Sequence, residues 1–495
     1  MSYDYVVVGA GSAGCVLASR LSDDPSARVL LLEAGPADGA RSIAVPARMP
    51  SLLGSGFDWS YRTVSQPHAA GRRVDWPQGH VLGGTSSINA MIYVRGHSAD
   101  FDTWRDAYGA TGWGHADLVP YFRRVEERLR VEAPRRRSRV PRAWVDAAGF
   151  EVVETLSGED EASGFYRLTT RRGRRWSAAD AYLRPSRPNL HVLTGVLVTK
   201  VLLSRGRAVG VQYQLGGDDQ EVRVRREVVL SAGAIRSPHL LLLSGIGPAD
   251  HLRLHGIPVE VDAPSVGQGL QDHPRVTALW QTKSGPRLGG YWRWRLFGRG
   301  PLASNGGEAG AFVRTKPGLA TPDLQYHVCP PGVRGREAAV LVTAVAVRSR
   351  GSIRLASGNP HVSPSIDPGY LSDEADLDVL VAGVRQAREI ASRAPFAGLV
   401  TGELAPGVPD DRVPDWVREN LVTMHHPTSS CAMGGAPGSV VAPDLRVRGV
   451  EGLRVVDASV MPAVTSGNTN APTYAIAERA ADLILGNTPL APVEE

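Results

Sequence analysis

The stretch Tyr5-Val6-Val7-Val8-Gly9-Ala10-Gly11-Ser12-Ala13-Gly14 decides the fold class of this chain. Its apolar run is typical of a short strand buried on both faces of a parallel sheet, and the glycines that follow are spaced as Gly-x-Gly-x-x-Gly. Apolar residues at helical spacing continue to Leu21, and a second apolar run, Val29 to Leu32, ends at Glu33. The segment therefore predicts a complete β–α–β unit in about 30 residues.

Each part of this unit suits the binding of a dinucleotide. Gly9 permits the tight turn, Gly11 lets a pyrophosphate approach the backbone, and Gly14 lets the helix lie close to the strand. The start of the helix offers unpaired N–H groups and partial positive charge to the pyrophosphate. Glu33 lies where a carboxylate accepts hydrogen bonds from an adenosine ribose. The alternative is a glycine-rich turn beside an ordinary acidic residue. The unit alone does not distinguish FAD from NAD, although its N-terminal position and the Glu33-Ala34-Gly35 run favour FAD.

Composition restricts the class of protein further. With 495 residues, 42% hydrophobic and 21% charged, the chain is too long for one small module and too apolar to be disordered, so we expect two or three lobes around a large core. The 55 basic and 50 acidic residues leave a net charge of only +5, which gives little support to a nucleic-acid partner. The arginines at 135–137 and 171–175 have no interleaved aromatic residues, so we expect solvated loops there.

Cysteine content and hydropathy indicate the cellular compartment of the protein. The three cysteines, Cys15, Cys329 and Cys431, exclude a disulfide framework and metal sites of the CxxC type. No apolar run approaches the roughly 20 residues of a membrane span, and the first residues lack the basic region of a signal peptide. We therefore expect a cytoplasmic chain with no integral membrane segment. The 55 glycines and 36 prolines suit an α/β enzyme with many tight turns.

Three further segments have recognisable patterns. A second glycine-rich loop extends from Gly79 to Asn89, and its small residues would let backbone pass against a flat ring system. The segment from Val228 to Gly247 predicts a strand, a turn, a helix and a glycine stop. Near the end, Leu453 to Asp457 predicts a strand, and Asn468-Thr469-Asn470-Ala471-Pro472 leads into a helix that reaches about Leu485, with the proline in its first turn.

Together these segments resemble the glucose-methanol-choline (GMC) family of flavoprotein oxidoreductases over nearly the whole chain. The resemblance depends on the GAxxSPxxLLxxSGIG block from Gly233 to Gly247, the LGGxSxxN block from Leu82 to Asn89, and C-terminal runs similar to HPxGTxxMG, LRVVDxSxMP and GNTNxPT. The segments DWSY and RGHSADFDTW are most similar to the bacterial choline-dehydrogenase and alcohol-dehydrogenase branch of the family. The resemblance implies FAD as the cofactor. It also implies an α/β fold with a Rossmann-type FAD-binding lobe and a second, substrate-binding lobe built on an antiparallel sheet.

The implied lobes are discontinuous in sequence. Residues 1–275 would form the FAD-binding lobe, residues 276–434 the substrate-binding lobe, and residues 435–495 would return to the FAD lobe and the active site. Alternating runs at Leu324 to Val328 and Ser352 to Leu355 support an antiparallel sheet in the second lobe. The flavin ring would lie between the lobes with the substrate over it.

By the same resemblance, His426 is the catalytic base and Asn468 its partner. Oxidation of an alcohol removes the hydroxyl proton while hydride moves to the flavin N5; one base and one orienting amide suffice for this. Asn470, two residues later, is the alternative candidate for the orienting amide. His425 is expected to pack or to make a secondary polar contact.

The residues that the resemblance assigns to FAD come from both glycine-rich loops, from one central strand and from the C-terminal segment. They are Gly9, Gly11, Ser12, Ala13, Gly14, Glu33, Ala34, Leu82, Gly83, Gly84, Thr85, Asn89, Ala90, Met91, Ile92, Val198, Asp457, Ala458, Asn468 and Thr469. Position 88 is isoleucine, whereas relatives with a histidine-linked flavin have histidine there, so we expect noncovalent FAD.

Several positions depart from the family pattern. Ser429-Ser430 replaces Gly-Thr after His426-Pro427, His80 replaces a basic residue, and Gly269 replaces asparagine. The altered Ser429-Ser430 keeps a non-oxidative alternative open, namely a lyase or a photodecarboxylase of the same fold. No metal is expected, because adjacent residues such as His425 and His426 point to opposite faces of an extended segment. The alcohol, the electron acceptor (a quinone-like carrier or oxygen) and the oligomeric state are not readable from the sequence.

Overall fold

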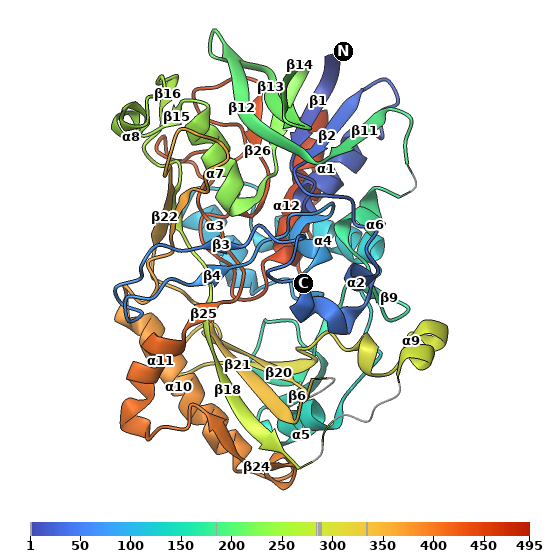
Figure 1. Cartoon of the computed structure of the whole chain (residues 1–495), viewed down its shortest axis with the longest axis vertical. Helices are drawn as coiled ribbons and strands as arrows, with labels where there is room; N and C mark the ends of the chain where they lie inside the picture. The colour runs from blue at the N-terminus through green and yellow to red at the C-terminus, as the bar shows by residue number, and fades with distance from the viewer. Residues whose placement is uncertain (1, 185, 284, 286–289, 333–334) are drawn as a thin grey trace.

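The computed structural model describes residues 2–184, 186–283, 285, 290–332 and 335–495. Two large sheets lie at opposite ends of the molecule (Figure 1). The first is a seven-stranded sheet in the order β11-β2-β1-β14-β13-β12, with β26 paired to β14. Its strands are β1 (Ser2–Val8), β2 (Val29–Glu33), β11 (Leu190–Thr194), β12 (Val196–Ser204), β13 (Arg207–Leu215), β14 (Asp218–Leu230) and β26 (Leu453–Val455).

This sheet joins segments that are far apart in the chain. Strands β11, β2, β1, β14 and β26 are parallel to their neighbours, whereas β12 and β13 form an antiparallel extension. Residues Val6 to Val8 and Val29 to Leu32 are buried, as the apolar runs predict for strands covered on both faces. Strand β26 lies beyond residue 435 yet pairs in this sheet at Val228↔Leu453.

Helices pack on this sheet and bring the predicted motifs together. The helices in contact with it or with one another are α1 (Ser12–Leu21), α4 (His115–Leu129), α6 (Ala178–Tyr182), α7 (Gly233–Leu243) and α12 (Asn470–Leu485). Helix α1 packs on β1 and β2, and α12 packs on α1 although the two are separated by most of the chain (Figure 1). The predicted helix after Asn468 is confirmed, since α12 begins at Asn470 and ends at Leu485.

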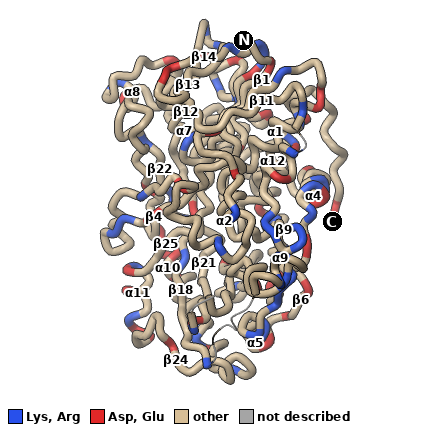
Figure 2. Tube along the Cα trace, turned by 45° about the vertical axis from the view of Figure 1, so that its right-hand side comes forward, with Lys and Arg blue, Asp and Glu red and all other residues tan. Residues whose placement is uncertain are grey.

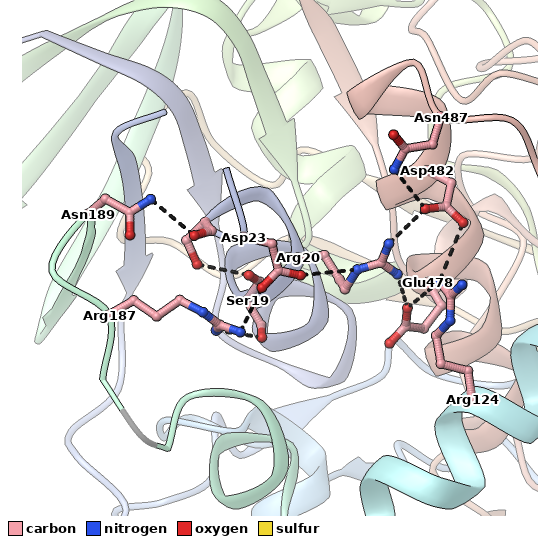
Figure 3. A network of polar contacts seen from close by, with 10 residues as sticks. Ser19, Arg20, Asp23, Arg124, Arg187, Asn189, Glu478, Asp482 and Asn487 are labelled. Carbon is pink, nitrogen blue, oxygen red and sulfur yellow. Dashed lines mark hydrogen bonds and ion pairs between the residues drawn. The ribbon is translucent and has the colours of Figure 1, made fainter. Parts of the chain in front are cut away.

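A buried ion-pair network fixes α1 to α12 (Figure 3). Arg20 of α1 donates to Glu478 and, at 2.7 Å, to Asp482; these two acids are one turn apart on α12. Arg124 of α4 approaches the same two carboxylates at 3.3 and 3.4 Å. Because the side chains of Glu478 and Asp482 are almost fully buried, these pairs are held in a low-dielectric environment where geometry is well defined. The network therefore fixes the relative position of two helices whose N-termini face the same cavity.

The second large sheet is eight-stranded, in the order β24-β18-β21-β20-β19-β7-β6 with β25 paired to β18. Its strands are β6 (Glu151–Thr155), β7 (Ala162–Phe165), β18 (Pro274–Thr282), β19 (Ala309–Val313), β20 (Leu324–Cys329), β21 (Glu337–Ala344), β24 (Val400–Ala405) and β25 (Val422–Thr423). All of its pairings except β6–β7 are antiparallel, which confirms the predicted sheet type. Strands β6 and β7 precede residue 275, so this sheet includes part of the segment that the sequence assigned to the FAD-binding lobe.

One face of the second sheet is covered by helices, and the other faces the first lobe. Helices α5 (Arg139–Ala148), α10 (Glu374–Ala391) and α11 (Val413–Asn420) pack on the covered face. There Tyr326 of β20 is fully buried and donates its hydroxyl proton to the carbonyl of Gly383 in α10. Because side chains alternate along a strand, Gln325, His327 and Cys329 point to the opposite face.

The run at Ser352 to Leu355 is a strand, as predicted, but it lies outside the large sheet. It forms β22 (Gly351–Arg354), which pairs antiparallel with β17 (Gln268–Leu270) and β23 (Ser365–Asp367). The remaining helices are α2 (Arg41–Ala44), α3 (Ser98–Asp106), α8 (Ala249–Leu254) and α9 (Tyr291–Phe297), with short 3₁₀ turns η1 (Pro46–Ser51), η2 (Gly84–Ser87), η3 (Pro301–Ala303), η4 (Phe396–Gly398), η5 (Asp410–Arg412) and η6 (Ala458–Val460). The short strands are β3 (Tyr61–Arg62), β4 (Asp75–Trp76), β5 (Ile92–Tyr93), β8 (Arg167–Leu168), β9 (Thr170–Arg171), β10 (Arg174–Arg175), β15 (Ile246–Gly247) and β16 (Val261–Asp262). Within the described residues, no helix is both long and apolar enough to cross a membrane.

Candidate active site

A cavity of about 520 Å³ lies between the two sheets. The cavity is lined by both glycine-rich loops, the end of β2, the starts of α7 and α12, and the inner face of β20. Of the predicted site residues, those that line it are Gly9, Gly11, Ser12, Ala13, Glu33, Ala34, Gly84, Thr85, Asn89, Ala90, Met91, Ile92, Val198, His426, Asp457, Ala458, Asn468 and Thr469. One cavity therefore brings together predicted residues from across the chain.

Three predicted cofactor residues, Gly14, Leu82 and Gly83, do not line the cavity. A Cβ on Gly14 would lie 1.8 Å from the carbonyl oxygen of Gly9, so Gly14 permits close packing of α1 on the β1 turn. Gly83 has φ +89° and donates its N–H to the carbonyl of Ala10 at 2.8 Å. Gly14 and Gly83 thus shape the loops that border the cavity.

The two glycine-rich loops pack backbone against backbone. A Cβ on Gly84 would lie 2.6 Å from the Cα of Gly11, and Gly84 has φ +55°. At Gly11 itself, an added Cβ would meet no heavy atom of the described residues within 4 Å, because that direction opens into the cavity. A group that requires close approach to the backbone therefore has room at Gly11.

Helix N-termini face the same space. Among the described residues, no side chain caps α1 or α12, and neither helix has an acidic residue in its first turn. Their first N–H groups and positive dipole ends are thus available to an anionic ligand. Ser12 of α1 donates its hydroxyl proton to Asn470 Oδ1 of α12 at 2.7 Å, which ties the two N-termini together. These features fit the diphosphate of a dinucleotide cofactor.

Glu33 and Asp457 are the carboxylates found among the described lining residues. Glu33 accepts the N–H groups of Ala10 and Gly35, each at 2.8 Å, and burial raises its pKa to about 7. Asp457 accepts from the Gly233 N–H at 2.9 Å, the Ser237 hydroxyl at 2.5 Å and the Ser459 N–H at 2.8 Å. Its carboxylate therefore holds the start of α7 against the turn after β26.

The predicted catalytic pair is in contact. Asn468 Nδ2 lies 3.2 Å from His426 Nε2, and both residues are buried and line the cavity. Asn470, the alternative register, is instead bonded to Ser12. His425 also lines the cavity, with φ +65° and with its N–H donated to Thr423 Oγ1, but none of the described contacts joins it to Asn468. The geometry favours the register with Asn468 and His426.

The surrounding hydrogen bonds determine which nitrogen of His426 carries the proton. The Tyr166 hydroxyl donates to the Tyr326 carbonyl, so its oxygen accepts from Gln325 Nε2 at 3.2 Å. Gln325 Nε2 also donates to Asn468 Oδ1, which leaves Asn468 Nδ2 as a donor to His426 Nε2. The Nε2 atom must then accept, so the proton lies on Nδ1.

His426 Nδ1 lies 2.9 Å from His273 Nδ1, where that proton is donated. In addition, the His426 N–H donates to the buried carboxylate of Asp272 at 2.7 Å. His273 and Asp272 therefore hold the ring and the backbone of His426, with the Nε2 lone pair directed toward Asn468.

Burial keeps this histidine group neutral. Loss of solvation lowers the pKa of His273 to about 4 and that of His327 and His425 to about 3, with Arg275 adding a repulsive charge to the last two. The pKa of His426 also lies well below its usual value, mainly through burial and then through the neighbouring histidines. A neutral imidazole is the form that can accept a proton.

Several residues of this site were not predicted from the sequence: Asp272, His273, Arg275, Gln325 and His327. Of these residues, Gln325 and His327 belong to the alternating run from Leu324 to Val328, which predicted only a strand. Both nitrogens of the buried His327 side chain lack a hydrogen-bond partner within the described structure, and the side chain lines the cavity. A polar residue at every second position of a core strand is the signal that could have identified Gln325 and His327.

No group of three or more His, Cys, Asp or Glu side chains in the described part of the chain is arranged to hold a metal ion. Ile88, where a histidine would carry a covalent flavin, is buried and lines the cavity. Its alkyl side chain has no atom that could link to a flavin.

Comparison with known proteins identifies the family. The GMC oxidoreductase family models match residues 3–275 and 347–477. The chain is 41% identical to a protein of Brucella ovis named oxygen-dependent choline dehydrogenase, over 99% of this chain and 97% of that protein. It is 42% identical to the human mitochondrial choline dehydrogenase, over 99% of this chain and 90% of the relative.

Solved structures agree with this assignment. Pyridoxine 4-oxidase from Mesorbium loti superposes with a TM-score of 0.89 at 32% identity, over 98% of this chain and 100% of that structure. Formate oxidase gives a TM-score of 0.89 at 26% identity, over 98% of both chains. These relatives lend no support to the lyase or photodecarboxylase alternative. The chain belongs to the GMC oxidoreductase family and is an FAD-dependent oxidoreductase that binds its FAD noncovalently and acts on CH–OH donors.

Proposed function

We propose that His426 is the base that accepts the hydroxyl proton of the alcohol and that Asn468 holds the same oxygen in place. The observation that carries this proposal is the 3.2 Å contact between Asn468 Nδ2 and His426 Nε2 at the cavity wall. An alcohol oxygen that enters between these two atoms replaces their contact: it donates its proton to the freed Nε2 lone pair and accepts a hydrogen bond from Nδ2. When bound, FAD supplies the acceptor for the hydride that leaves the carbon.

The neighbours of His426 prepare it for this role. Its Nδ1 proton is held by His273, so the ring cannot turn without losing that bond, and the bond to the Asp272 carboxylate fixes its backbone. The proton gained at Nε2 makes the ring cationic in a buried site, which costs free energy. We infer that the low pKa of His426 favours rapid release of the proton.

The test compares His426→Ala with His425→Ala. The first should retain FAD yet slow anaerobic flavin reduction by roughly 10²- to 10⁴-fold, with part of the rate recovered at high pH as alkoxide forms. The second should slow it far less, because His425 lacks the contact with Asn468. A larger loss for His425→Ala at equal FAD content would show that the base is misassigned.

The variant Asn468→Ala tests the orienting role of the amide. It should slow flavin reduction while leaving its pH profile in place, because the base remains and only orientation is lost. A pH profile that moves with this substitution would argue that Asn468 acts through the protonation of His426 rather than on the substrate oxygen.

We also propose that the alcohol is uncharged or anionic rather than a quaternary ammonium compound such as the choline named for the relatives. Arg275, at the start of β18, lines the cavity near His327, His425 and Cys329, and its charge affects the pKa of each. It donates to the Thr423 carbonyl at 3.2 Å and to Thr277 Oγ1 at 2.7 Å, and it forms no ion pair with any described carboxylate.

Asp272 attracts Arg275 but is buried outside the cavity wall, and the other charges on the wall do not offset Arg275. Arg136 lies 3.4 Å from Glu308, so that pair is close to neutral. Glu33 ends β2 and Asp457 lies in the turn after β26, and both accept backbone N–H groups there. At about 10 Å and an effective dielectric constant of about 20, one unit charge repels another by roughly 1.7 kcal/mol, which is more than tenfold in binding.

A matched pair of substrates isolates this charge. Choline and 3,3-dimethylbutan-1-ol have the same shape and differ by one positive charge. We expect kcat/KM to be at least about tenfold higher for the neutral alcohol, and we expect Arg275→Gln, but not Arg275→Lys, to reduce that ratio. A higher kcat/KM for choline in the unaltered enzyme would overturn this proposal.

A cytoplasmic location stays a proposal, and the three free cysteines support a reducing compartment.

A further inference from the structure

Helix α9 exposes an apolar surface that the oxidoreductase activity does not explain. Its residues Tyr291, Trp292, Leu296 and Phe297 are 50%, 68%, 67% and 65% exposed. Exposed large apolar side chains elsewhere, such as Leu254 at 83%, are dispersed over other elements. Single exposed apolar residues are ordinary, but four on two turns of one helix indicate an interaction surface. In Figure 1, α9 projects from the side of the molecule.

The helix is firmly seated on the protein. Trp294 on its inner side is buried and donates its indole N–H to the Gly173 carbonyl at 2.8 Å, and it packs with Val45 and Ala303. Gly298, which ends the helix with φ +60°, lies so close to the β9–β10 hairpin that a Cβ would be 1.9 Å from the Arg172 carbonyl oxygen. The exposed residues are therefore held outward by a fixed base.

Positive charge surrounds the apolar residues. Arg293, Arg295 and Arg299 are exposed, as are Arg172 and Arg174 of the neighbouring hairpin. None of these five arginines forms an ion pair with a described residue, and neither 290–300 nor 171–175 contains an acidic residue. Figure 2 shows basic residues around β9 and α9. This arrangement is complementary to an anionic lipid surface, because the arginines can contact the anionic headgroups while the aromatic and aliphatic residues contact the apolar layer beneath them.

We propose that α9 and the β9–β10 hairpin dock the enzyme onto an anionic membrane surface, with Trp292, Leu296 and Phe297 entering the headgroup boundary. A second copy of this chain is a poorer occupant, because a two-fold interface would bring the same arginines face to face. An anionic surface compensates these charges instead.

The docking surface adjoins the active-site cavity. Helix α9 leads into η3, and Pro301 of η3 and Ser304 line the cavity. Turn η1, which packs against η3, contributes Pro46, Met49 and Pro50 to the same wall. Docking at α9 therefore places this wall of the cavity beside the lipid, where a lipid-soluble electron carrier would be concentrated.

The test is co-sedimentation of the FAD-loaded enzyme with vesicles. Vesicles of phosphatidylcholine containing phosphatidylglycerol should bind the enzyme, whereas pure phosphatidylcholine vesicles should bind at least about tenfold more weakly, since each arginine near an anionic surface contributes about fivefold. High salt should weaken binding because exposed charges are screened.

Variants separate the contributions of charge and apolar contact. Arg293→Ser with Arg295→Ser, and separately Trp292→Ser with Phe297→Ser, should each reduce vesicle binding at least about tenfold with unchanged FAD content and alcohol oxidation in solution. Leu254→Ser on α8, which is even more exposed but far from the cluster in sequence, should bind as the unaltered enzyme does. The proposal would be overturned if vesicle binding were equally strong with and without phosphatidylglycerol. It would also be overturned if both double variants bound vesicles as the unaltered enzyme does. Loss of a dimer in light scattering when Trp292 and Phe297 are changed would overturn it as well, since α9 would then contact a second copy.

Discussion

Gly11 offers a direct test of how the cofactor contacts the protein. Its backbone has φ −76° and ψ −163°, which an L-residue adopts without strain, and an added Cβ meets no described heavy atom within 4 Å. Gly11→Ala should therefore fold normally and should change the stability of the apoprotein by less than about 1 kcal/mol. The added methyl group enters the space where the diphosphate approaches the helix N-terminus.

We expect Gly11→Ala to reduce the affinity for FAD and to leave the stability of the apoprotein unchanged. Overfilling a tight contact by a methyl group costs about 1–3 kcal/mol, so the Kd for FAD should rise roughly 5- to 150-fold, and the larger Gly11→Val should abolish retention of FAD on purification. The assay is titration of apoprotein with FAD, read by flavin fluorescence, together with thermal unfolding of the apoprotein.

Two other glycines provide controls. Gly39 is exposed and an added Cβ has no described neighbour within 4 Å, so Gly39→Ala should leave both FAD affinity and stability unchanged. Gly14→Ala would place a Cβ 1.8 Å from the Gly9 carbonyl oxygen, so it should destabilise the apoprotein itself. If Gly11→Ala binds FAD within twofold of the unaltered protein, the cofactor does not approach this turn and the assignment of the site is wrong.

Three other predictions follow from the site. The fold should lose stability as the pH falls below about 6.5, because four buried histidines, His239, His273, His327 and His425, stay neutral in the folded state to pH about 3–4 while the unfolded chain binds protons. At pH 5.5 each costs about 1.4 kcal/mol, but the raised pKa values of Glu33, about 7, and Asp100, about 6, act in the opposite direction and offset roughly half of the sum, which leaves a net loss of roughly 3 kcal/mol. A flat chemical-denaturation profile of the apoprotein from pH 7 to 5.5 would contradict this. Acid precipitation should release the flavin as free FAD, since Ile88 cannot form a covalent link, and flavin remaining with the precipitate would refute that. The third prediction depends only on the resemblance to the dehydrogenase branch: electrons should pass to a quinone-like or artificial acceptor in preference to oxygen, and peroxide production in air at the rate seen with a dye acceptor would show the reverse.

The cofactor side of the site was largely predictable from sequence because its physical requirements are local. The turn after β1 needs glycines at fixed offsets, and Gly9 with φ +94° meets that need within a few residues of Ser12. The strand and helix on either side have apolar patterns that do not depend on distant partners. The same locality explains why α12 was predicted to within a few residues, since Asn468 to Pro472 contains its own start signal.

The substrate side was predicted less completely because it depends on long-range pairing. The residues Gln325 and His327 face the cavity only because β20 pairs with β19 and β21 in one register. A shift of one residue would direct Tyr326 to the cavity and bury Gln325 against the helices. The alternation predicts a strand, but it does not say which of its faces meets the cofactor.

The Gln271-Asp272-His273 run shows how three adjacent residues align the segments that carry the proposed base, His426, and its proposed partner, Asn468. The N–H and carbonyl groups of Gln271 pair with Thr428, two residues after His426, at 3.2 and 2.9 Å. Its side-chain oxygen accepts the N–H of Val464, four residues before Asn468, at 3.0 Å. Asp272 accepts the N–H of His426 itself. Because one short run holds both segments, the distance between His426 and Asn468 does not depend on the length of chain that separates them, and a change at Gln271 should disturb both side chains at once.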